Sequence, residues 1–204
     1  MDTSNIPAGT FQITLANASQ YIILGLFYVI VTKTNALTTT DIGTLSILSF
    51  LVDAFSLLTL LALPTALTKF ASEKLVKNQK EEATAIQKTI TKIVLALSIA
   101  GFAIAALSSQ LLSQYLWNSS EYTLLVILML TYAFLFNVIT LCKSTLQALY
   151  LFGKMATLTI IFIVSSRIVA ITLALLHMDV IGVIIGYIVA VSYTHLTLPT
   201  KRIV

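Results

Sequence analysis

Charged residues are scarce in this chain. Of its 204 residues, 10% are Asp, Glu, Lys or Arg, whereas about 25% is usual in water-soluble domains. Hydrophobic residues make up 58% of the chain, and its mean hydropathy is +0.97. A surface with so few charges does not keep a folded domain in water, which excludes a soluble globular protein. The composition therefore predicts an integral membrane protein.

Glycine, proline and cysteine are scarce as well. The seven glycines and three prolines are few for a β-barrel built on turns. The apolar segments run for about 20 residues without the alternation of barrel strands, which is the length that a helix needs to cross a bilayer. We therefore predict an all-α fold, a polytopic bundle of membrane helices. The single cysteine, Cys142, excludes an internal disulfide and a zinc site built from cysteines, and we interpret it as a packing residue.

Motifs for chemistry on covalent bonds are missing too. The sequence contains no H-E-x-x-H, no phosphate-binding glycine loop, no G-x-S-x-G and no acidic cluster suited to a metal-bound sugar nucleotide. His177 and Asp179, two groups in one turn, are too few for a metal site. We predict that the protein is not an enzyme and has no cofactor and no metal. Its formal charge of +4 comes from lysines in short loops, which suit anionic lipid headgroups rather than nucleic acid.

Six apolar segments are present, and a lysine-rich stretch separates the second from the third. The stretch from Leu61 to Ile90 ends one span, forms a charged loop that we expect to be partly helical, and begins the next span. Pro64 is expected to bend the second span near its end, because proline removes a backbone hydrogen bond. We treat residues 1–190 as one amino-terminal transmembrane bundle. Its predicted spans cover approximately 10–31, 42–67, 89–112, 122–146, 156–176 and 180–190, the last of them truncated.

The last residues differ in origin from the rest. Val191 to Thr200 reads VSYTHLTLPT, which resembles the translation of a transposase-library sequencing adapter. We therefore expect residues 191–204 to be a non-native tail. The natural sequence of this fragment would then end at about Ala190, inside a span, and the whole protein would be longer.

The lysines in and next to the loops alternate between the two sides of the membrane. One Lys or Arg follows span 1, six surround the loop after span 2, none follows span 3, two flank the loop after span 4 and none follows span 5. Loops rich in Lys and Arg stay in the cytoplasm. The pattern therefore predicts a cytoplasmic amino terminus. Asn118 begins an N-x-S sequon in a predicted outer loop, and we interpret it as an unused sequon.

Ionisable side chains inside the predicted spans mark the candidate site, since such groups cost about 3 kcal/mol at the bilayer centre. Asp53 lies near the middle of predicted span 2 and Arg167 near the middle of predicted span 5, and Gln20 and Asn137 reach a similar depth. One interpretation is a central polar cavity in which Arg167 contacts an anionic substrate and Asp53 is its partner or a proton or sodium site. The other is a structural pair of Asp53 and Arg167 that fixes helix packing. Both remain open at this point.

Four short segments resemble one family of transporters. They are a first span that ends in a polar loop, TTTDIGTLSILSFL (Thr38–Leu51), LALPTALTKFASEKL (Leu61–Leu75) and STLQALYLFGKMA (Ser144–Ala156). In these segments and in its spacing, the chain is similar to the amino-terminal lobe of polysaccharide and oligosaccharide flippases of the multidrug/oligosaccharidyl-lipid/polysaccharide exporter superfamily. Ala62 and Lys69 depart from the glycine and arginine that are common there.

The resemblance implies a transporter of two six-helix bundles that moves a lipid-linked sugar across the cytoplasmic membrane of a prokaryote by alternating access. It further implies that cationic residues in the cavity hold the lipid pyrophosphate, with Arg167 as the candidate within the membrane and Asp53, Asn137 and Gln20 beside it. The partners would be the lipid-linked sugar, membrane lipids and a coupling proton or sodium ion. A cytoplasmic basic rim would consist of Lys69, Lys92, Lys143 and Lys154.

Two alternatives accompany this interpretation. The first is a proton- or sodium-coupled drug or cation antiporter of the same superfamily, in which Asp53 is the ion site. The second is a membrane assembly protein without transport, in which Asp53 and Arg167 serve only the stability of the fold. Gly182 and Gly186 form a GxxxG spacing, which we attribute to packing within the chain rather than to dimerisation.

Overall fold

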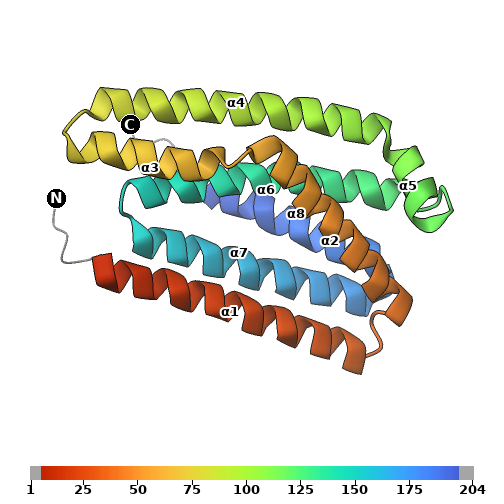
Figure 1. The fold of residues 1–204 in the computed structure, drawn as a ribbon. Coiled ribbons are helices and arrows are strands. Elements are labelled where there is room, and N and C mark those ends of the chain that lie inside the picture. Colours follow the sequence, from red (N-terminus) through yellow and green to blue (C-terminus); the bar gives the residue numbers. More distant parts are fainter. Residues whose placement is uncertain (1–5, 198–204) are drawn as a thin grey trace.

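The structure is a computed structural model, and it describes residues 6–197 (Figure 1). Every regular element in this part of the chain is a helix, which confirms the all-α prediction. The helices are α1 (Ile6–Lys33), α2 (Thr39–Leu60), α3 (Leu63–Val76), α4 (Lys80–Leu107), α5 (Ser109–Trp117), α6 (Thr123–Ala148), α7 (Phe152–Leu173) and α8 (Asp179–Thr197).

Five helical stretches of the described chain are long and apolar enough to cross a membrane, so the protein is a multi-pass membrane protein. The last stretch, Phe152–Tyr193, covers 42 residues, about twice the length that one crossing needs. It contains a π-helical turn, Ala174–Met178, in which His177 adopts φ 60°. The chain reverses there, as expected for a tight turn, and the stretch comprises the two helices α7 and α8.

The predicted end of the second span at residue 67 is wrong. The helix stops at Leu60, because the next two residues, Leu61 and Ala62, both adopt left-handed backbone conformations (φ 46° and 58°). A new helix, α3, begins at Leu63 and carries Pro64 in its first turn. Proline is tolerated at this place because its missing N–H would have no partner within the helix. The expected bend is therefore a break, and it lies before the proline.

The predicted charged loop between the second and third spans is largely helical. Helix α3 continues to Val76 and α4 begins at Lys80, so that a short turn joins two antiparallel helices (Figure 1). Glu73 and Lys77 form an i,i+4 ion pair at 2.7 Å that supports the last turn of α3. Helix α4 ends at Leu107, before the expected residue 112. A separate short helix, α5, covers the predicted end of the third span and the first half of the predicted outer loop.

Helix α6 lies in the centre of the bundle. It packs against α2, α3, α4, α7 and α8, while α4 and α1 form opposite edges (Figure 1). Its side chains Val126, Met129, Ala133 and Ile139 have at most 1% of their surface exposed. By contrast, α2 and α4 expose large apolar side chains such as Leu57, Leu58 and Ile104, as expected for surfaces that face lipid.

Helices α7 and α8 approach each other more closely than ordinary side chains allow. A Cβ atom on Gly186 would lie 2.6 Å from the backbone nitrogen of Ala170, and one on Gly182 would lie 2.9 Å from Cβ of Leu173. This register is antiparallel. The GxxxG spacing therefore serves packing within the chain, which confirms the prediction.

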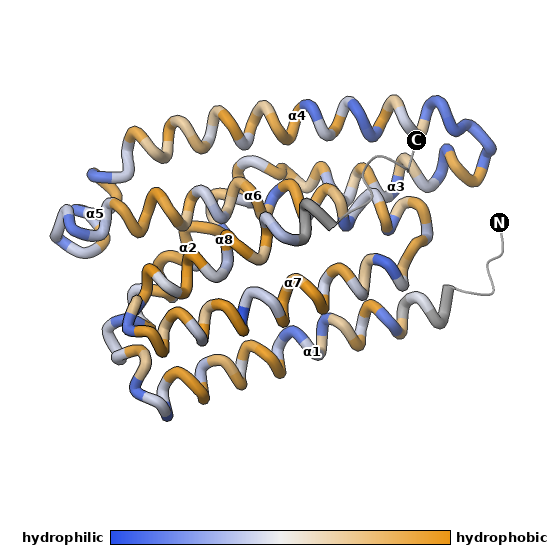
Figure 2. Tube along the Cα trace, turned by 180° about the vertical axis from the view of Figure 1, so that it is seen from behind, coloured by the Kyte–Doolittle hydropathy of each residue, from blue (hydrophilic) through white to orange (hydrophobic). Residues whose placement is uncertain are grey.

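The two ends of the bundle differ in charge. The α3–α4 turn, the α6–α7 connection and the start of α1 lie at one end, and the α1–α2 loop, α5 and the α7–α8 turn lie at the other (Figure 1). Figure 2 shows hydrophilic residues at both ends of the bundle, with a prominent group around the α3–α4 turn, and hydrophobic residues along the middle of the helices. Of the described residues, eight lysines belong to the segments at the α3–α4 end, whereas the segments at the other end carry three acidic residues and Lys33. We call the first end the lysine-rich end; its lysines are Lys69, Lys74, Lys77, Lys80, Lys88, Lys92, Lys143 and Lys154.

Substitution of Gly186 by valine is expected to destabilise the fold by about 1–3 kcal/mol, because the new side chain has no room beside Ala170. The matched control is Gly25→Val, since no atom lies within 4 Å of a Cβ at Gly25. Thermal unfolding of the purified proteins in detergent measures the difference. Equal midpoints for the two variants would contradict the close approach of α7 and α8.

Substitution of Ala62 by glycine is expected to stabilise the fold by up to about 1 kcal/mol. The left-handed conformation costs a residue with a Cβ about 1–2 kcal/mol, and glycine adopts it freely at a smaller cost in chain entropy. The control is Ala66→Gly inside α3, which should destabilise by about 1 kcal/mol. The same unfolding measurement applies, and a loss of stability in both variants would show that the break at Ala62 is misplaced.

Candidate functional site

The guanidinium group of Arg167 lies between two aromatic rings. Its Cζ atom is 4.9 Å from the ring centroid of Phe27 on α1 and 4.7 Å from that of Tyr187 on α8. The guanidinium also donates a hydrogen bond from Nη1 to the hydroxyl of Tyr187. Both rings belong to buried residues. The cation is therefore held by the π-faces of two neighbouring helices.

The packing of α7 brings these groups together. The contact of Gly186 with Ala170 sets the register of α7 and α8, and it places Tyr187 opposite Arg167. Helix α1 packs along α7 and supplies Phe27. Arg167 lies fifteen residues after the start of α7 and six before its end, so it is closer to the α7–α8 turn than to the lysine-rich end. The helical stretch continues beyond α7 as the π-helical turn Ala174–Met178, so the predicted position near the middle of the span stays a prediction.

Arg167 has no acidic partner among the described residues. The ion pairs of this part of the chain are Lys74 with Glu82 and Lys77 with Glu73. The Nε atom of Arg167 is buried and has no hydrogen-bond acceptor. The expected alternative of a direct pair between Asp53 and Arg167 is therefore not formed.

A second tyrosine extends the surroundings of Arg167. The rings of Tyr132 on α6 and Tyr187 on α8 are in contact, with centroids 5.4 Å apart. The Asp53 side chain is exposed on α2 and forms no ion pair among the described residues. We name Phe27, Arg167, Tyr187 and Tyr132 the arginine cluster.

Asn137 belongs to a different site. Its Nδ2 donates to the hydroxyl oxygens of Thr59 on α2 (2.7 Å) and Ser98 on α4 (3.1 Å), and all three residues are buried. Asn137 follows Tyr132 by five residues, a rotation of about 140° around α6, which turns it away from the arginine cluster. The Oδ1 atom of Asn137 has no partner. This polar triad ties α6 to α2 and α4, and it holds Asn137 apart from Arg167.

The other predicted residues lie on the surface. Gln20 is exposed on α1, and Lys69, Lys92 and Lys154 are exposed at the lysine-rich end. Lys143 is half-buried, with its ammonium nitrogen 5.8 Å from the ring centroid of Phe162. Lys69 likewise lies over an aromatic ring, that of Phe70, at 5.6 Å from its centroid. The predicted rim residues therefore differ in burial, since Lys143 is half-buried and the other three are exposed.

Sequence reasoning missed the aromatic partners of Arg167 and the hydroxyl partners of Asn137. Phe27, Tyr132 and Tyr187 are typical of any apolar span, and nothing in the sequence pairs them with an arginine. The sequence does not identify Thr59 and Ser98 as partners of Asn137 either, because small hydroxyl residues are frequent in membrane helices. Only the packing of helices that are far apart in the sequence reveals these contacts.

The described residues contain no group of three or more His, Cys, Asp or Glu side chains placed to bind a metal ion. His177 and Asp179 lie in and after the π-helical turn. No model of a known family matches the chain, and no curated protein or solved structure gives a significant match. The fold and the arginine cluster define a multi-pass α-helical membrane protein with a cation between its helices.

Substitution of Asn137 by leucine is expected to destabilise the fold by about 1–2 kcal/mol. The change keeps the size of the side chain but leaves the buried Ser98 hydroxyl without its partner, and hydrogen bonds between membrane helices contribute about 0.6 kcal/mol on average and at most about 1.7. The matched control is Thr140→Val on the same helix, whose hydroxyl bonds only to its own helix at Phe136. Unfolding in detergent compares the two, and equal effects would contradict a tie between α6 and its neighbours.

Proposed function

We propose that the chain is the amino-terminal lobe of a transporter that moves a lipid-linked sugar across the cytoplasmic membrane of a prokaryote by alternating access, with the amino terminus in the cytoplasm. The observation that carries the proposal is Arg167, a cation within a predicted span that lacks an ion pair among the described residues. A charge kept in such a place at a cost of several kcal/mol is typical of a binding site.

The chemistry of Arg167 suits a phosphate group. Its planar guanidinium has five N–H donors, stays protonated and binds phosphate oxygens in pairs. Tyr187 accepts one hydrogen bond, and the two aromatic faces hold the plane of the group. The stacking fixes the orientation without neutralising the charge, so a pyrophosphate would supply the missing counter-ion.

The distribution of charge supports entry of an anionic substrate at the lysine-rich end. The lysine-rich end gathers eight lysines of the described chain, including the predicted rim residues Lys69, Lys92 and Lys154. Such a field attracts an anion from the cytoplasmic leaflet. Arg167 lies beyond the middle of α7 as seen from this end. A lipid pyrophosphate would meet the lysines first and Arg167 deeper in the bundle.

A second function has an observation in its favour. The Asp53 carboxylate is exposed on α2 and forms no ion pair among the described residues. In a proton- or sodium-coupled antiporter such a group would bind the coupling ion, and Arg167 would only support the fold. The two functions make different predictions: a flippase loses pyrophosphate binding when Arg167 is replaced, whereas an antiporter loses its response to the coupling ion when Asp53 is replaced.

Substitution of Arg167 by glutamine is expected to weaken the binding of farnesyl pyrophosphate at least tenfold, since a hydrogen bond to a charged group contributes about 1.5–3 kcal/mol. Binding is measured by isothermal titration calorimetry on the full chain in nanodiscs. Arg167→Lys should lie between the wild type and Arg167→Gln, because it keeps the charge and loses the planar fork. Lys33→Gln, which removes a charge at the opposite end from the other lysines, is the control and should bind as the wild type does.

Thermal unfolding of each variant separates binding from folding. Wild-type affinity in a folded Arg167→Gln protein would refute the role given to Arg167. If Asp53→Asn abolishes a sodium or proton response while Arg167→Gln changes nothing, the antiporter replaces the flippase. If both variants lose only stability, the chain is an assembly protein without transport.

A further inference from the structure

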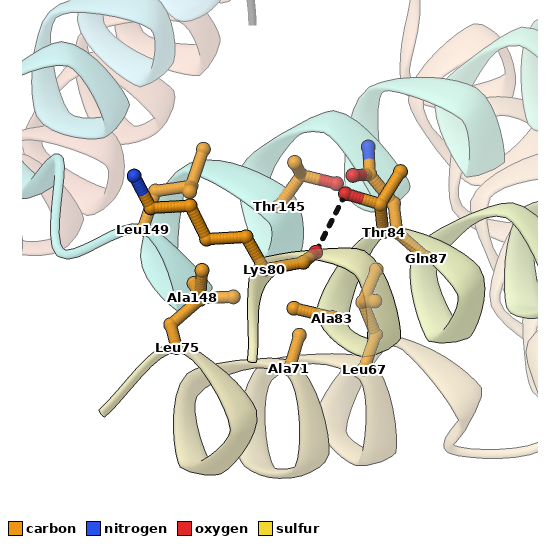
Figure 3. Close-up of a pocket in the computed structure, with 10 residues that line it drawn as sticks. All are labelled: Leu67, Ala71, Leu75, Lys80, Ala83, Thr84, Gln87, Thr145, Ala148 and Leu149. Carbon is orange, nitrogen blue, oxygen red and sulfur yellow. Dashed lines mark hydrogen bonds between the residues drawn. The ribbon is translucent and has the colours of Figure 1, made fainter. Parts of the chain in front are cut away.

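A pocket of about 270 Å³ lies among α3, α4 and the end of α6, near the lysine-rich end (Figure 3). Its lining combines apolar residues with a smaller polar part. The apolar part consists of Leu67, Ala71, Leu75, Ala83, Ala148 and Leu149. The polar part consists of Lys80, Thr84, Gln87 and Thr145. This site is distinct from the arginine cluster, with which it shares no residue.

The pocket exists because three helices present alanine at their junction. Ala71 on α3, Ala83 on α4 and Ala148 on α6 are all buried, with 2–5% of their surface exposed. In Figure 3 these short side chains surround the hollow, and Leu67 closes it on the α3 side. Longer side chains at these positions would fill the space. The apolar part therefore fits the hydrocarbon of a guest molecule.

Two lysines close to the pocket are already held in ion pairs. Close by, Lys74 pairs with Glu82 at 2.6 Å and Lys77 pairs with Glu73 at 2.7 Å. The hydrogen bond from Lys77 also lowers the pKa of the Glu73 carboxyl, so this pair stays ionised at neutral pH.

Lys80 forms no ion pair among the described residues, and its side chain extends toward Leu149 across the pocket in Figure 3. Its backbone carbonyl accepts a hydrogen bond from the Thr84 hydroxyl, and its side chain is exposed. Gln87 contributes a further polar group at the same pocket.

The position of the pocket along α4 follows from the charged residues of this helix. Lys92 is the last charged residue of α4 before its apolar part, and Thr84 precedes it by eight residues, about 12 Å along the helix. The pocket thus lies on the lysine-rich side of the apolar part of α4. Basic pockets between membrane helices on the cytoplasmic side suit the headgroups of anionic lipids.

We propose that this pocket binds one anionic phospholipid of the surrounding leaflet. Lys80 pairs with the phosphate, Gln87 donates to the phosphate or ester oxygens, and the upper part of an acyl chain lies among the leucines and alanines. The lipid would fill the space between the α3–α4 pair and α6. Helix α3, which lines this space, begins directly after the break at Leu61 and Ala62.

The test is retention of phosphatidylglycerol by the full chain, measured by native mass spectrometry from mixed micelles. Lys80→Gln is expected to weaken retention about fivefold, the effect of one lysine near the surface. The matched control is Lys88→Gln, which removes the same charge from the same helix outside the pocket and should leave retention unchanged. Ala148→Leu, which fills the pocket, should abolish it in a protein whose unfolding midpoint is checked in parallel.

Two comparisons identify the ligand. Phosphatidylcholine with the same acyl chains should be retained more weakly, because its headgroup has no net charge. Glycerol 1-phosphate, which carries the phosphate without an acyl chain, should not displace the lipid at equal concentration. The proposal is overturned if Lys80→Gln and Lys88→Gln have equal effects, if both lipids are retained equally, or if glycerol 1-phosphate competes as well as the lipid does.

Discussion

The contact between Gly186 on α8 and Ala170 on α7 determines much of the remaining structure. It brings two backbones close enough that even a methyl group would clash. In a bilayer, helices gain little from hiding apolar surface, so close packing of this kind is the main attraction between them. The same contact aligns Tyr187 with Arg167, one residue further along α8 and three residues earlier on α7. A packing interaction thereby creates the setting of the only arginine in the described residues.

The partners of Arg167 stabilise its charge but do not neutralise it. A cation over an aromatic ring gains about 0.5–2 kcal/mol, depending on how far it is desolvated. Burial of an arginine at the centre of a membrane helix costs about 3 kcal/mol on insertion scales and more in simulations. Two rings and one hydroxyl therefore offset the cost of burial in large part, whereas a carboxylate would also cancel the charge. What remains is an oriented cation without a counter-ion among the described residues, and the proposed binding of an anion rests on this observation.

Hydropathy and charge gave a reliable outline of the fold. The apolar runs located the long helices, and the chain reversal near His177 was expected from two polar residues between apolar segments. The helix boundaries failed where a left-handed residue interrupts an apolar run, as at Leu61 and Ala62, because neither residue type signals such a conformation. The charged segment that follows was expected to be a partly helical loop, and it is helical except for the short turn between Val76 and Lys80.

The candidate site was predictable as a list of polar residues and not as an arrangement. Depth in a span placed Arg167 and Asn137 together, but depth says nothing about the side of the helix that carries each residue. Asn137 proved to face α2 and α4, where its hydrogen bonds lie, and the neighbours of Arg167 proved to be aromatic. Contacts of this kind join residues that are far apart in the sequence, and only the packed bundle defines them.

The break between α2 and α3 links the arrangement of the bundle to the pocket at its lysine-rich end. A continuous helix would carry residues 61–76 onward along the axis of α2, which crosses the bundle obliquely in Figure 1. The left-handed residues Leu61 and Ala62 redirect the chain instead, so that Leu67 and Ala71 pack beside Ala148 of α6. The pocket thus depends on two backbone conformations that cost energy in residues other than glycine. A guest that binds between α3, α4 and α6 would favour this broken form over a straightened one, because only the broken form brings Leu67 and Ala71 to Ala148.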